Sequence, residues 1–439
     1  MSHNENLIAA IDIGTTKVVA IIGKRKENGR IEILGISKTP STGIKRGVVQ
    51  NIDETVNAIT RTMEEVQTYS GAIFSDVFVG IAGQHIKTIR NRGYINRNSY
   101  EDEITRKDID DLIKEMYNIS IDVGEEIIHV LPQNFIVDNE TGIKNPVGML
   151  GRRVEANFHI VIGQITSARN IGKCISKAGL KLNELILEPL ASSAAVLTAD
   201  EKEAGVALVD IGGGTTDVAV YYDDIIRHTA VIPFGGDVVT KDIKEGCSIL
   251  QRQAELLKIQ YGSALGDIAR DDEVVSIPGI SGREPKEISL KSLAYIIQSR
   301  MEEILNAVLY EIENSGYYER LSAGIVVTGG GALLKDLPQL VKFITGMDVR
   351  LGYPSELLAS ESVDDVNNPM FSTSVGLILK GWEFLEQHRD EYEKNEESTE
   401  DSSEETEEEE EQPEAENRGF IGRLKQAFND IFEENDAEM

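Results

Sequence analysis

The sequence carries two similar segments, 198 positions apart, that each predict a strand, a turn of glycine and threonine, and a second strand. The first runs from Ala10 to Ala20 (AIDIGTTKVVA) and the second from Leu208 to Val220 (LVDIGGGTTDVAV). A further apolar run follows each of them, Ile31 to Ser37 and Ile225 to Ile232. A duplication of this kind favours a mixed α/β fold built from two similar halves.

The rest of the hydrophobic pattern predicts the elements that complete the two halves and an insertion in the first half. Between Gln84 and Gln164 the pattern changes, and we expect a small inserted α+β subdomain there. The expected elements are a helix over Val56–Val66, a strand over Val77–Ile81, an insert with a helix near Asp108–Met116 and strands over Ile127–Val137 and Glu155–Ile162, a helix over Asp237–Tyr261, short strands within Val274–Leu290, a long amphipathic helix over Leu293–Glu313, a strand over Ile325–Val327 running into a helix after the glycines at 329–331, and a last helix from about Ser374 to Glu386.

Charge is concentrated near the C-terminal end of the sequence. The formal net charge is -31, and Asp390–Glu416 holds 16 acidic residues against one lysine, which gives this stretch -15 and leaves -16 elsewhere. Such a composition cannot bury apolar surface, so we expect a disordered, extended linker. An acidic chain repels phosphate backbones, which argues against nucleic acid as a partner.

Apolar residues return after this linker at helical spacing. They are Phe420, Ile421, Leu424, Ala427, Phe428, Ile431 and Phe432, with Arg418, Arg423 and Lys425 near the start. A broad apolar face with basic residues beside it is typical of a helix that lies in the surface of a bilayer. Docking on the protein's own core is the alternative, and the charged linker argues against it.

Cysteine use and hydropathy favour a cytoplasmic protein. Cys174 and Cys247 have neither the spacing of a zinc site nor that of a disulfide framework. The apolar run from Leu7 to Gly23 is interrupted by Asp12 and Lys17, and no signal-peptide cleavage pattern follows it. We therefore expect a chain that neither leaves the cytoplasm nor crosses a membrane.

The two repeated turns are suited to binding a triphosphate. Glycines at 14 and at 212–214 allow the backbone N–H groups to approach phosphate oxygens, and the threonines at 15, 16, 215 and 216 add hydroxyl donors. Asp12 and Asp210 stand at the strand ends that enter the turns, where two carboxylates can hold a hydrated Mg²⁺. One such turn is usually only a hairpin, but two at this separation indicate a shared site.

Two further segments carry less information alone. Thr328–Ala332 (TGGGA) follows a buried strand and is otherwise a tight strand-to-helix turn, while Leu187–Ala195 (LEPLASSAA) opens a helix of small residues with Glu188 and a proline. In their order along the chain, these two segments and the two turns resemble the phosphate, connecting and adenosine segments of the actin, Hsp70 and sugar-kinase superfamily. The P-loop pattern GxxxxGK[ST] does not occur.

Within that superfamily the sequence is most similar to the FtsA family, from Ile8 to about Gln387. The supporting segments are Ile44–Val49, Ile81–Gly83, Gly142–Met149, Ile232–Asp237 and Thr373–Leu377. The resemblance implies an actin-like ATPase fold of the α/β class, with two duplicated ribonuclease-H-like domains and an inserted 1C subdomain. FtsA proteins lack the 1B subdomain of actin, which agrees with the short connection from Ser37 to Val48.

The resemblance also implies a division into domains. Residues 1–83 and 165–200, completed by a helix at 374–388, would form domain I (subdomain 1A), and 84–164 would form subdomain 1C. Residues 201–373 would form domain II, with subdomain 2A and with 2B at about 245–315. The acidic linker would cover 389–416 and the amphipathic membrane-targeting helix 417–439.

The expected site residues follow from the motifs and from the resemblance. Asp12 and Asp210 would hold Mg²⁺ through water and, with Glu188 near the γ-phosphate, take the catalytic role; Glu188 has an equally good interpretation as a structural helix start. The expected ATP contacts are Gly14, Thr15, Thr16, Lys17, Gly212, Gly213, Gly214, Thr215, Thr216, Gly235, Gly236, Glu255, Lys258, Gly329, Gly330, Gly331 and Ala332. For Lys17 the alternative to a phosphate contact is a side chain that faces solvent from its strand. The expected membrane contacts are Phe420, Ile421, Leu424, Phe428, Ile431 and Phe432.

The function implied is that of an ATP-binding cytoskeletal adaptor with at most slow hydrolysis, not a metabolic enzyme. It would polymerise at the division septum on the cytoplasmic face of the membrane, bind the C-terminal tail of FtsZ through subdomain 2B, near Leu293–Glu313 with Arg300, and recruit other divisome proteins. The alternatives are a soluble actin-like ATPase of the pilus-assembly or chaperone type and a sugar kinase. A kinase needs a catalytic Asp and a substrate-binding insertion, for which the sequence offers no convincing candidate.

Overall fold

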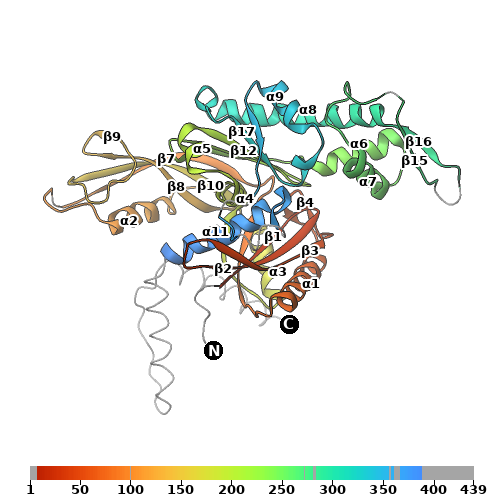
Figure 1. The fold of residues 1–439 in the computed structure, drawn as a ribbon. Helices are drawn as coiled ribbons and strands as arrows, with labels where there is room; N and C mark the ends of the chain where they lie inside the picture. Colours follow the sequence, from red (N-terminus) through yellow and green to blue (C-terminus); the bar gives the residue numbers. More distant parts are fainter. Residues whose placement is uncertain are drawn as a thin grey trace, which may run out of the picture. The chain divides into compact units, whose positions relative to one another are not determined.

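Two five-stranded sheets of the same topology form the framework of the protein (Figure 1). The structure is a computed structural model that describes residues 7–98, 100–270, 272–279, 283–354, 357–359 and 366–387. The predicted linker at 389–416 and the predicted membrane helix at 417–439 lie outside these residues. Within the described ranges, no helix has the length and apolarity needed to span a bilayer.

The first sheet has the strand order β11-β6-β1-β2-β3. Its strands are β1 (Leu7–Ile13), β2 (Lys17–Arg25), β3 (Ile31–Pro40), β6 (Asp76–Ile81) and β11 (Lys181–Leu187). The pairs β1–β2 and β2–β3 are antiparallel, whereas β1–β6 and β6–β11 are parallel. A short hairpin of β4 (Ile44–Lys45) and β5 (Val48–Val49) follows β3.

The second sheet repeats this arrangement with the order β14-β13-β12-β17-β18. Its strands are β12 (Val206–Ile211), β13 (Thr216–Tyr222), β14 (Ile225–Ile232), β17 (Ile325–Thr328) and β18 (Val349–Leu351). Antiparallel and parallel pairs occur at the same places as in the first sheet. The duplication predicted from the two turns is therefore a duplication of whole sheets.

Helices cover both faces of each sheet, which explains why the central strands are continuous apolar runs (Figure 1). The outer face of the first sheet packs against α1 (Ile52–Ser70) and α3 (Ile165–Lys177). Between the sheets lie α4 (Glu188–Val196) and α11 (Ser372–Gln387). The other face of the second sheet packs against α6 (Gly236–Cys247), α8 (Leu290–Asn314) and α9 (Leu337–Thr345).

The remaining elements are short. They are α5 (Ala199–Ala204), α7 (Gln251–Tyr261), the hairpin of β15 (Val274–Ile277) and β16 (Lys286–Ser289), and the 3-10 helices η2 (Tyr318–Arg320), η3 (Gly330–Leu333) and η5 (Pro369–Phe371).

The insert is a four-stranded antiparallel sheet with one helix, as the change of pattern after Gln84 predicts. Its strand order is β7-β10-β8-β9, formed by β7 (Lys87–Asn96), β8 (Glu125–Val137), β9 (Glu140–Ile143) and β10 (Arg153–Gln164), and α2 (Arg106–Met116) packs on it. Strands β7 and β9 were not predicted, because β7 is mostly polar with no regular alternation of apolar residues and β9 is only four residues long.

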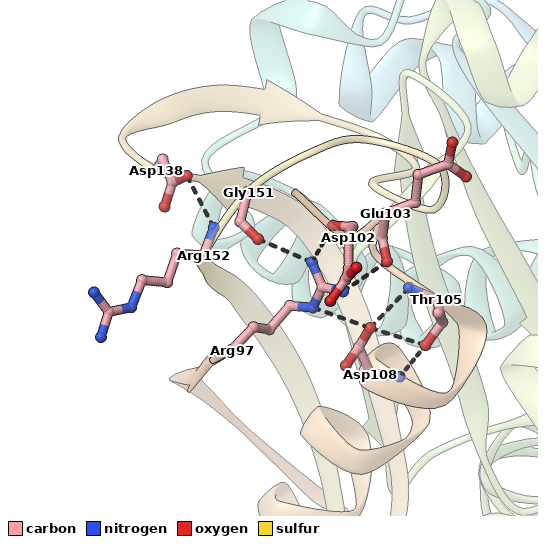
Figure 2. Close-up of polar contacts among 8 residues, drawn as sticks. All are labelled: Arg97, Asp102, Glu103, Thr105, Asp108, Asp138, Gly151 and Arg152. Carbon is pink, nitrogen blue, oxygen red and sulfur yellow. Dashed lines mark hydrogen bonds and ion pairs between the residues drawn. The ribbon is translucent and has the colours of Figure 1, made fainter. Parts of the chain in front are cut away.

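Arg97 fastens the end of this insert (Figure 2). Its guanidinium donates to the carbonyl oxygens of Asp102 at 2.8 Å, Glu103 at 2.6 Å and Gly151 at 3.0 Å, and it pairs with Asp108 at 3.3 Å. Asp108 also accepts from the backbone N–H of Thr105 at 2.8 Å and so caps α2. One nearly buried cation therefore joins three chain segments.

Two predicted helices differ in the structure. The helix expected over Asp237–Tyr261 is two helices, α6 and α7, because Ser248 has the left-handed φ of 49° and ends α6. The glycines after β17 enter the 3-10 helix η3, and the α-helix starts only at Leu337. Three successive glycines favour a tight turn over the start of a regular helix.

Candidate functional site

Asp12 and Asp210 occupy the same place in the two sheets, one residue before the end of β1 and of β12. Both are nearly buried, each at 6% exposure. Ser374 donates to Oδ2 of Asp12 at 3.2 Å. Ser192 and Thr373 donate to Oδ2 of Asp210 at 2.5 and 3.1 Å. Hydroxyl groups of α4 and α11 thus hold both carboxylates.

Strand register aligns the two turns residue by residue. Asp12 faces Val19 across β1 and β2, and Asp210 faces Asp217 across β12 and β13. Each turn places four residues between its innermost pairs, Ile13–Val18 and Ile211–Thr216. Thr15-Thr16 therefore stands where the second turn has Gly213-Gly214, and Lys17 stands where it has Thr215.

The turns face each other so closely that glycine is required in the second one. A Cβ on Gly213 would lie 2.4 Å from Cγ2 of Thr16, and a Cβ on Gly214 would lie 2.3 Å from Oγ1 of Thr15. Gly329, with a φ of 85°, passes Asp210 so closely that its Cβ would lie 2.2 Å from Oδ1. Any larger residue at these three positions would push the two halves apart or displace the carboxylate.

A cavity between the turns collects most of the predicted residues. It is lined by Asp12, Gly14, Thr15, Thr16, Lys17, Glu188, Asp210, Gly212, Gly213, Gly214, Thr215, Gly329 and Gly330, all of them predicted, and by Asp217, Met370 and Thr373. The lining comes from both sheets, from α4 and from the start of α11. The lining residues thus converge from five stretches of sequence.

Four carboxyl groups share this cavity with one cation. Loss of hydration raises the pKa of Asp12 and of Asp210, and it raises the pKa of Asp217 and of Glu188 well above the usual range. The negative charges of the neighbouring carboxylates add to the effect on Asp217 and Glu188. Lys17 acts in the opposite direction on Asp12, Asp210 and Glu188. The cavity therefore favours protons or an added cation.

Mg²⁺ fits this donor set when it keeps its water ligands. Among the described residues no three His, Cys, Asp or Glu side chains are close enough to enclose a metal ion. Mg²⁺ commonly binds through one or two carboxylates, water and substrate phosphates. Asp12 and Asp210, which approach from opposite sheets, are the two carboxylates suited to this role.

Several predicted residues lie beside the cavity and do not line it. Thr216 is already part of β13, and its hydroxyl donates to the carbonyl of Phe234 at 2.9 Å, so it is not the free donor that the sequence suggested. Gly331 packs on Ile211, and Ala332 is buried in the core on the second sheet. Both are part of η3, whose glycines turn the chain after β17.

The predicted nucleoside residues form a group of their own. Gly236 donates its N–H to the carbonyl of Gly212 at 2.9 Å, which joins Gly235-Gly236 to the second turn. Lys258 donates to the carbonyl of Gly236 at 3.0 Å and pairs with Glu255 at 2.8 Å. Glu255 also accepts from Thr240. These residues adjoin the turn, and their contact with a nucleoside stays a prediction.

Sequence reasoning missed three groups of this site. Asp217 is in the quoted segment, and alternation along β13 is the signal that would have placed it beside Asp210. Thr373 and Ser192 lacked such a signal, because they reach Asp210 only through the packing of α11 and α4 between the sheets.

Known proteins resemble the sequence over most of its length. It is 40% identical over 375 residues to the cell division protein FtsA of Pseudomonas aeruginosa, covering 85% of this chain and 89% of that protein. The chain belongs to the FtsA family. FtsA of Escherichia coli K12 is 35% identical over 398 residues, with 89% and 94% covered. Family models for "Cell division protein FtsA" and "SHS2 domain inserted in FTSA" match residues 207–376 and 83–162.

Solved structures place this FtsA-family chain in the actin-like fold. A PilM-PilN type IV pilus biogenesis complex matches with a TM-score of 0.61 at 14% identity, over 85% of this chain and 98% of that one. MreB5 of Spiroplasma citri bound to ADP matches with a TM-score of 0.53 at 15% identity, over 88% and 98%. At these identities the likeness concerns the fold alone. The insert that the family model matches is the block predicted from Gln84 to Gln164.

Proposed function

We propose that this FtsA-family protein binds ATP with Mg²⁺ in the cavity between its two turns. The observation that carries the proposal is the facing pair of glycine turns, with Asp12 and Asp210 at equivalent strand ends. Backbone N–H groups of both turns, with Lys17, are suited to the phosphates, and the two aspartates to hydrated Mg²⁺. MreB5 of Spiroplasma citri, of the same fold, was solved with ADP and with AMPPNP.

A binding measurement on a turn variant tests this proposal. Calorimetric titration of the full-length protein with AMPPNP should show one site that requires Mg²⁺. Gly213→Val should remove binding, because its side chain would occupy the space of Thr16. Its melting temperature, followed by circular dichroism, separates loss of the site from loss of the fold. A folded Gly213→Val protein that binds AMPPNP as well as wild type would refute the site.

Hydrolysis of the bound ATP is slow in this proposal. Glu188 lines the cavity and is the residue suited to orient a water molecule. Burial and the neighbouring carboxylates raise the pKa of Glu188 well above the usual range, which opposes the ionised form that accepts a proton from the attacking water. The nucleotide therefore serves to hold the two halves together, and assembly of ATP-bound molecules into filaments is the output.

We further propose that the filament binds the cytoplasmic membrane through residues 417–439. The support is the sequence pattern of Phe420, Ile421, Leu424, Phe428, Ile431 and Phe432. The acidic residues near the end of this segment weaken attraction to anionic lipid, so one helix binds weakly and polymerisation adds avidity. Localisation at the septum and recruitment of other divisome proteins are parts of the same proposal, which rests on family membership.

Liposome pelleting tests the membrane proposal. The full chain and a chain stopped at Asn417 are each mixed with liposomes, with and without ATP and Mg²⁺. Pelleting of the full chain alone, increased by ATP, is the expected result. If both chains stay in the supernatant under every condition, the membrane segment has been assigned wrongly.

The C-terminal tail of FtsZ is the proposed partner of subdomain 2B. Exposed apolar side chains gather on the elements around β15, and they are Leu256, Ile259, Tyr261 and Val274. On α8, Arg300 pairs with Asp242 of α6 at 2.5 Å. Arg300→Glu places like charges together here and should weaken binding of an FtsZ tail peptide in fluorescence anisotropy. Unchanged binding would move the docking site away from α8.

A further inference from the structure

One side chain of the insert contacts the end of a strand of the first sheet, next to the cavity residue Glu188. His129 lies in β8, and its Nε2 accepts a hydrogen bond from the backbone N–H of Leu187 at 3.0 Å. Leu187 is the last residue of β11, the edge strand of the first sheet. The bond therefore joins the insert to the end of the strand that leads into α4.

The backbone at Leu187 sets the direction of Glu188. Glu188 is the first residue of α4 and is followed by Pro189, whose ring fixes its own φ. On the other side, Gly80 leaves room for the glutamate, since a Cβ there would lie 3.1 Å from Cγ of Glu188. Leu187 offers no side-chain cap to the helix. The hydrogen bond to His129 is thus the contact that holds this N–H group in place.

The His129 ring is in the neutral form that its role as a hydrogen-bond acceptor requires. Loss of hydration, with the nearby positive charge of Lys380, lowers the pKa of His129 to about 4. The imidazole is therefore neutral at physiological pH. Because Nε2 accepts an N–H group, the single ring proton is on Nδ1. Such a ring holds the same bond throughout the physiological pH range.

We propose that His129 of the insert is a positioning residue for Glu188, acting through the N–H group of Leu187. This inference deepens the proposed function and rests on the role given there to Glu188 in ATP hydrolysis. It gives the insert a direct connection to the hydrolytic end of the cavity. A contact that shifts β8 changes the orientation of the Glu188 carboxyl. The rate of ATP hydrolysis therefore responds to a molecule that binds the insert.

Two substitutions at this position separate the hydrogen bond from packing. His129→Leu keeps an apolar body but removes the acceptor, whereas His129→Gln restores an acceptor near the place of Nε2. We expect His129→Leu to lower kcat of the full-length ATPase about tenfold, with the Kd for ATP within about twofold of wild type. His129→Gln should recover most of kcat. Equal kcat in His129→Leu and wild type overturns the proposal.

NMR of the wild-type protein provides a readout that does not depend on activity. With ¹⁵N-labelled histidine, His129 should show an unprotonated Nε2 and a protonated Nδ1, without titration between pH 5.5 and 8 as expected for a pKa of about 4. With ¹⁵N-labelled leucine, the Leu187 amide should be protected from exchange in wild type and in His129→Gln. A proton on Nε2, or an unprotected Leu187 amide in wild type, overturns the proposal even if His129→Leu fails to fold.

Glu188→Gln separates the positioning role of His129 from the role proposed for Glu188 in hydrolysis. If Glu188→Gln lowers kcat and His129→Leu does not, the positioning role is wrong while the proposed function stands. If Glu188→Gln leaves kcat unchanged, the role of Glu188 in the proposed function is wrong, and with it the role of His129. Loss of kcat in Glu188→Gln and His129→Leu, with recovery in His129→Gln, supports both.

Discussion

Gly376→Ala is the substitution whose effect follows most directly from the structure. Gly376 is in α11 at the crossing with α4, where a Cβ would lie 1.8 Å from the carbonyl oxygen of Ala191 and 2.2 Å from its carbonyl carbon. Both neighbours are backbone atoms, so no side chain can rotate away. The two helices must separate to admit one methyl group.

The size of this separation gives the expected loss of stability. Carbon and oxygen atoms in contact are normally about 3.3 Å apart, so the helices must part by roughly 1.5 Å. Overpacking of this kind costs about 3 kcal/mol, and replacing a helical glycine by alanine returns about 1 kcal/mol. We expect a net loss of about 2 kcal/mol. With an unfolding entropy of about 0.8 kcal/mol/K for a body of this size, the melting temperature should fall by roughly 3 °C.

The same shift should affect nucleotide binding, because α11 carries the hydroxyl donors to both aspartates. We expect the Kd for AMPPNP with Mg²⁺ to rise about tenfold, in line with loss of one hydrogen bond to a charged group. Differential scanning calorimetry and calorimetric titration measure the two effects on one preparation.

Gly246→Ala is the matched control. Gly246 is in α6, and a Cβ there would lie 2.8 Å from Cδ1 of Ile296, the end of a flexible side chain. The free energy of unfolding of Gly246→Ala should stay within about 1 kcal/mol of the wild-type value, and its Kd for AMPPNP with Mg²⁺ should be unchanged. If Gly376→Ala behaves like Gly246→Ala, the close approach of α4 and α11 does not hold in solution and the reasoning fails.

Three further substitutions test the charges. Arg97→Met should cost about 1–2 kcal/mol, because it removes charged hydrogen bonds to three carbonyl groups of which two are open to water. Hydrogen exchange at 100–105 should become faster, and unchanged exchange would contradict the fastening role. Burial raises the pKa of Glu184 to about 7, above its value in the unfolded chain. The free energy of unfolding of the wild type therefore falls as the pH rises from the unfolded to the folded pKa. Glu184→Gln should lessen this fall between pH 5 and pH 8 by up to about 3 kcal/mol, as measured by urea titrations. Asp217→Asn removes one cavity carboxylate, so ATP without Mg²⁺ should bind more tightly than to wild type, and weaker binding would refute the charge argument.

The parts of the fold that sequence predicts are those that local patterns specify. The two turns carry their own glycines and flanking apolar strands, so Asp12 and Asp210 could be placed without knowledge of the rest of the chain. The insert was visible because the hydrophobic pattern changes after Gln84. The duplication of the turns then predicted that the two halves face one another and share one site.

The contacts that sequence did not reveal depend on packing between distant segments. Thr216 is turned away from the cavity because register assigns it to β13, two places beyond the position that matches Thr16. Ser248 ends α6 through a single left-handed residue within a helical pattern. His129 and Leu187 are 58 positions apart, and only the approach of β8 to the edge of the first sheet brings them together.

The first turn of α11 is the place where the two halves of the site are joined. Ser372 is hydrogen-bonded to Thr328 of β17 at 2.6 Å, and the next two residues donate to Asp210 and to Asp12. Three successive hydroxyl groups thus connect one helix end to both sheets. A change in the spacing of the two aspartates must break one of these bonds or move the helix. Because the predicted linker follows α11 in the sequence, a helix that moves in response to the cavity also moves the point from which that linker starts.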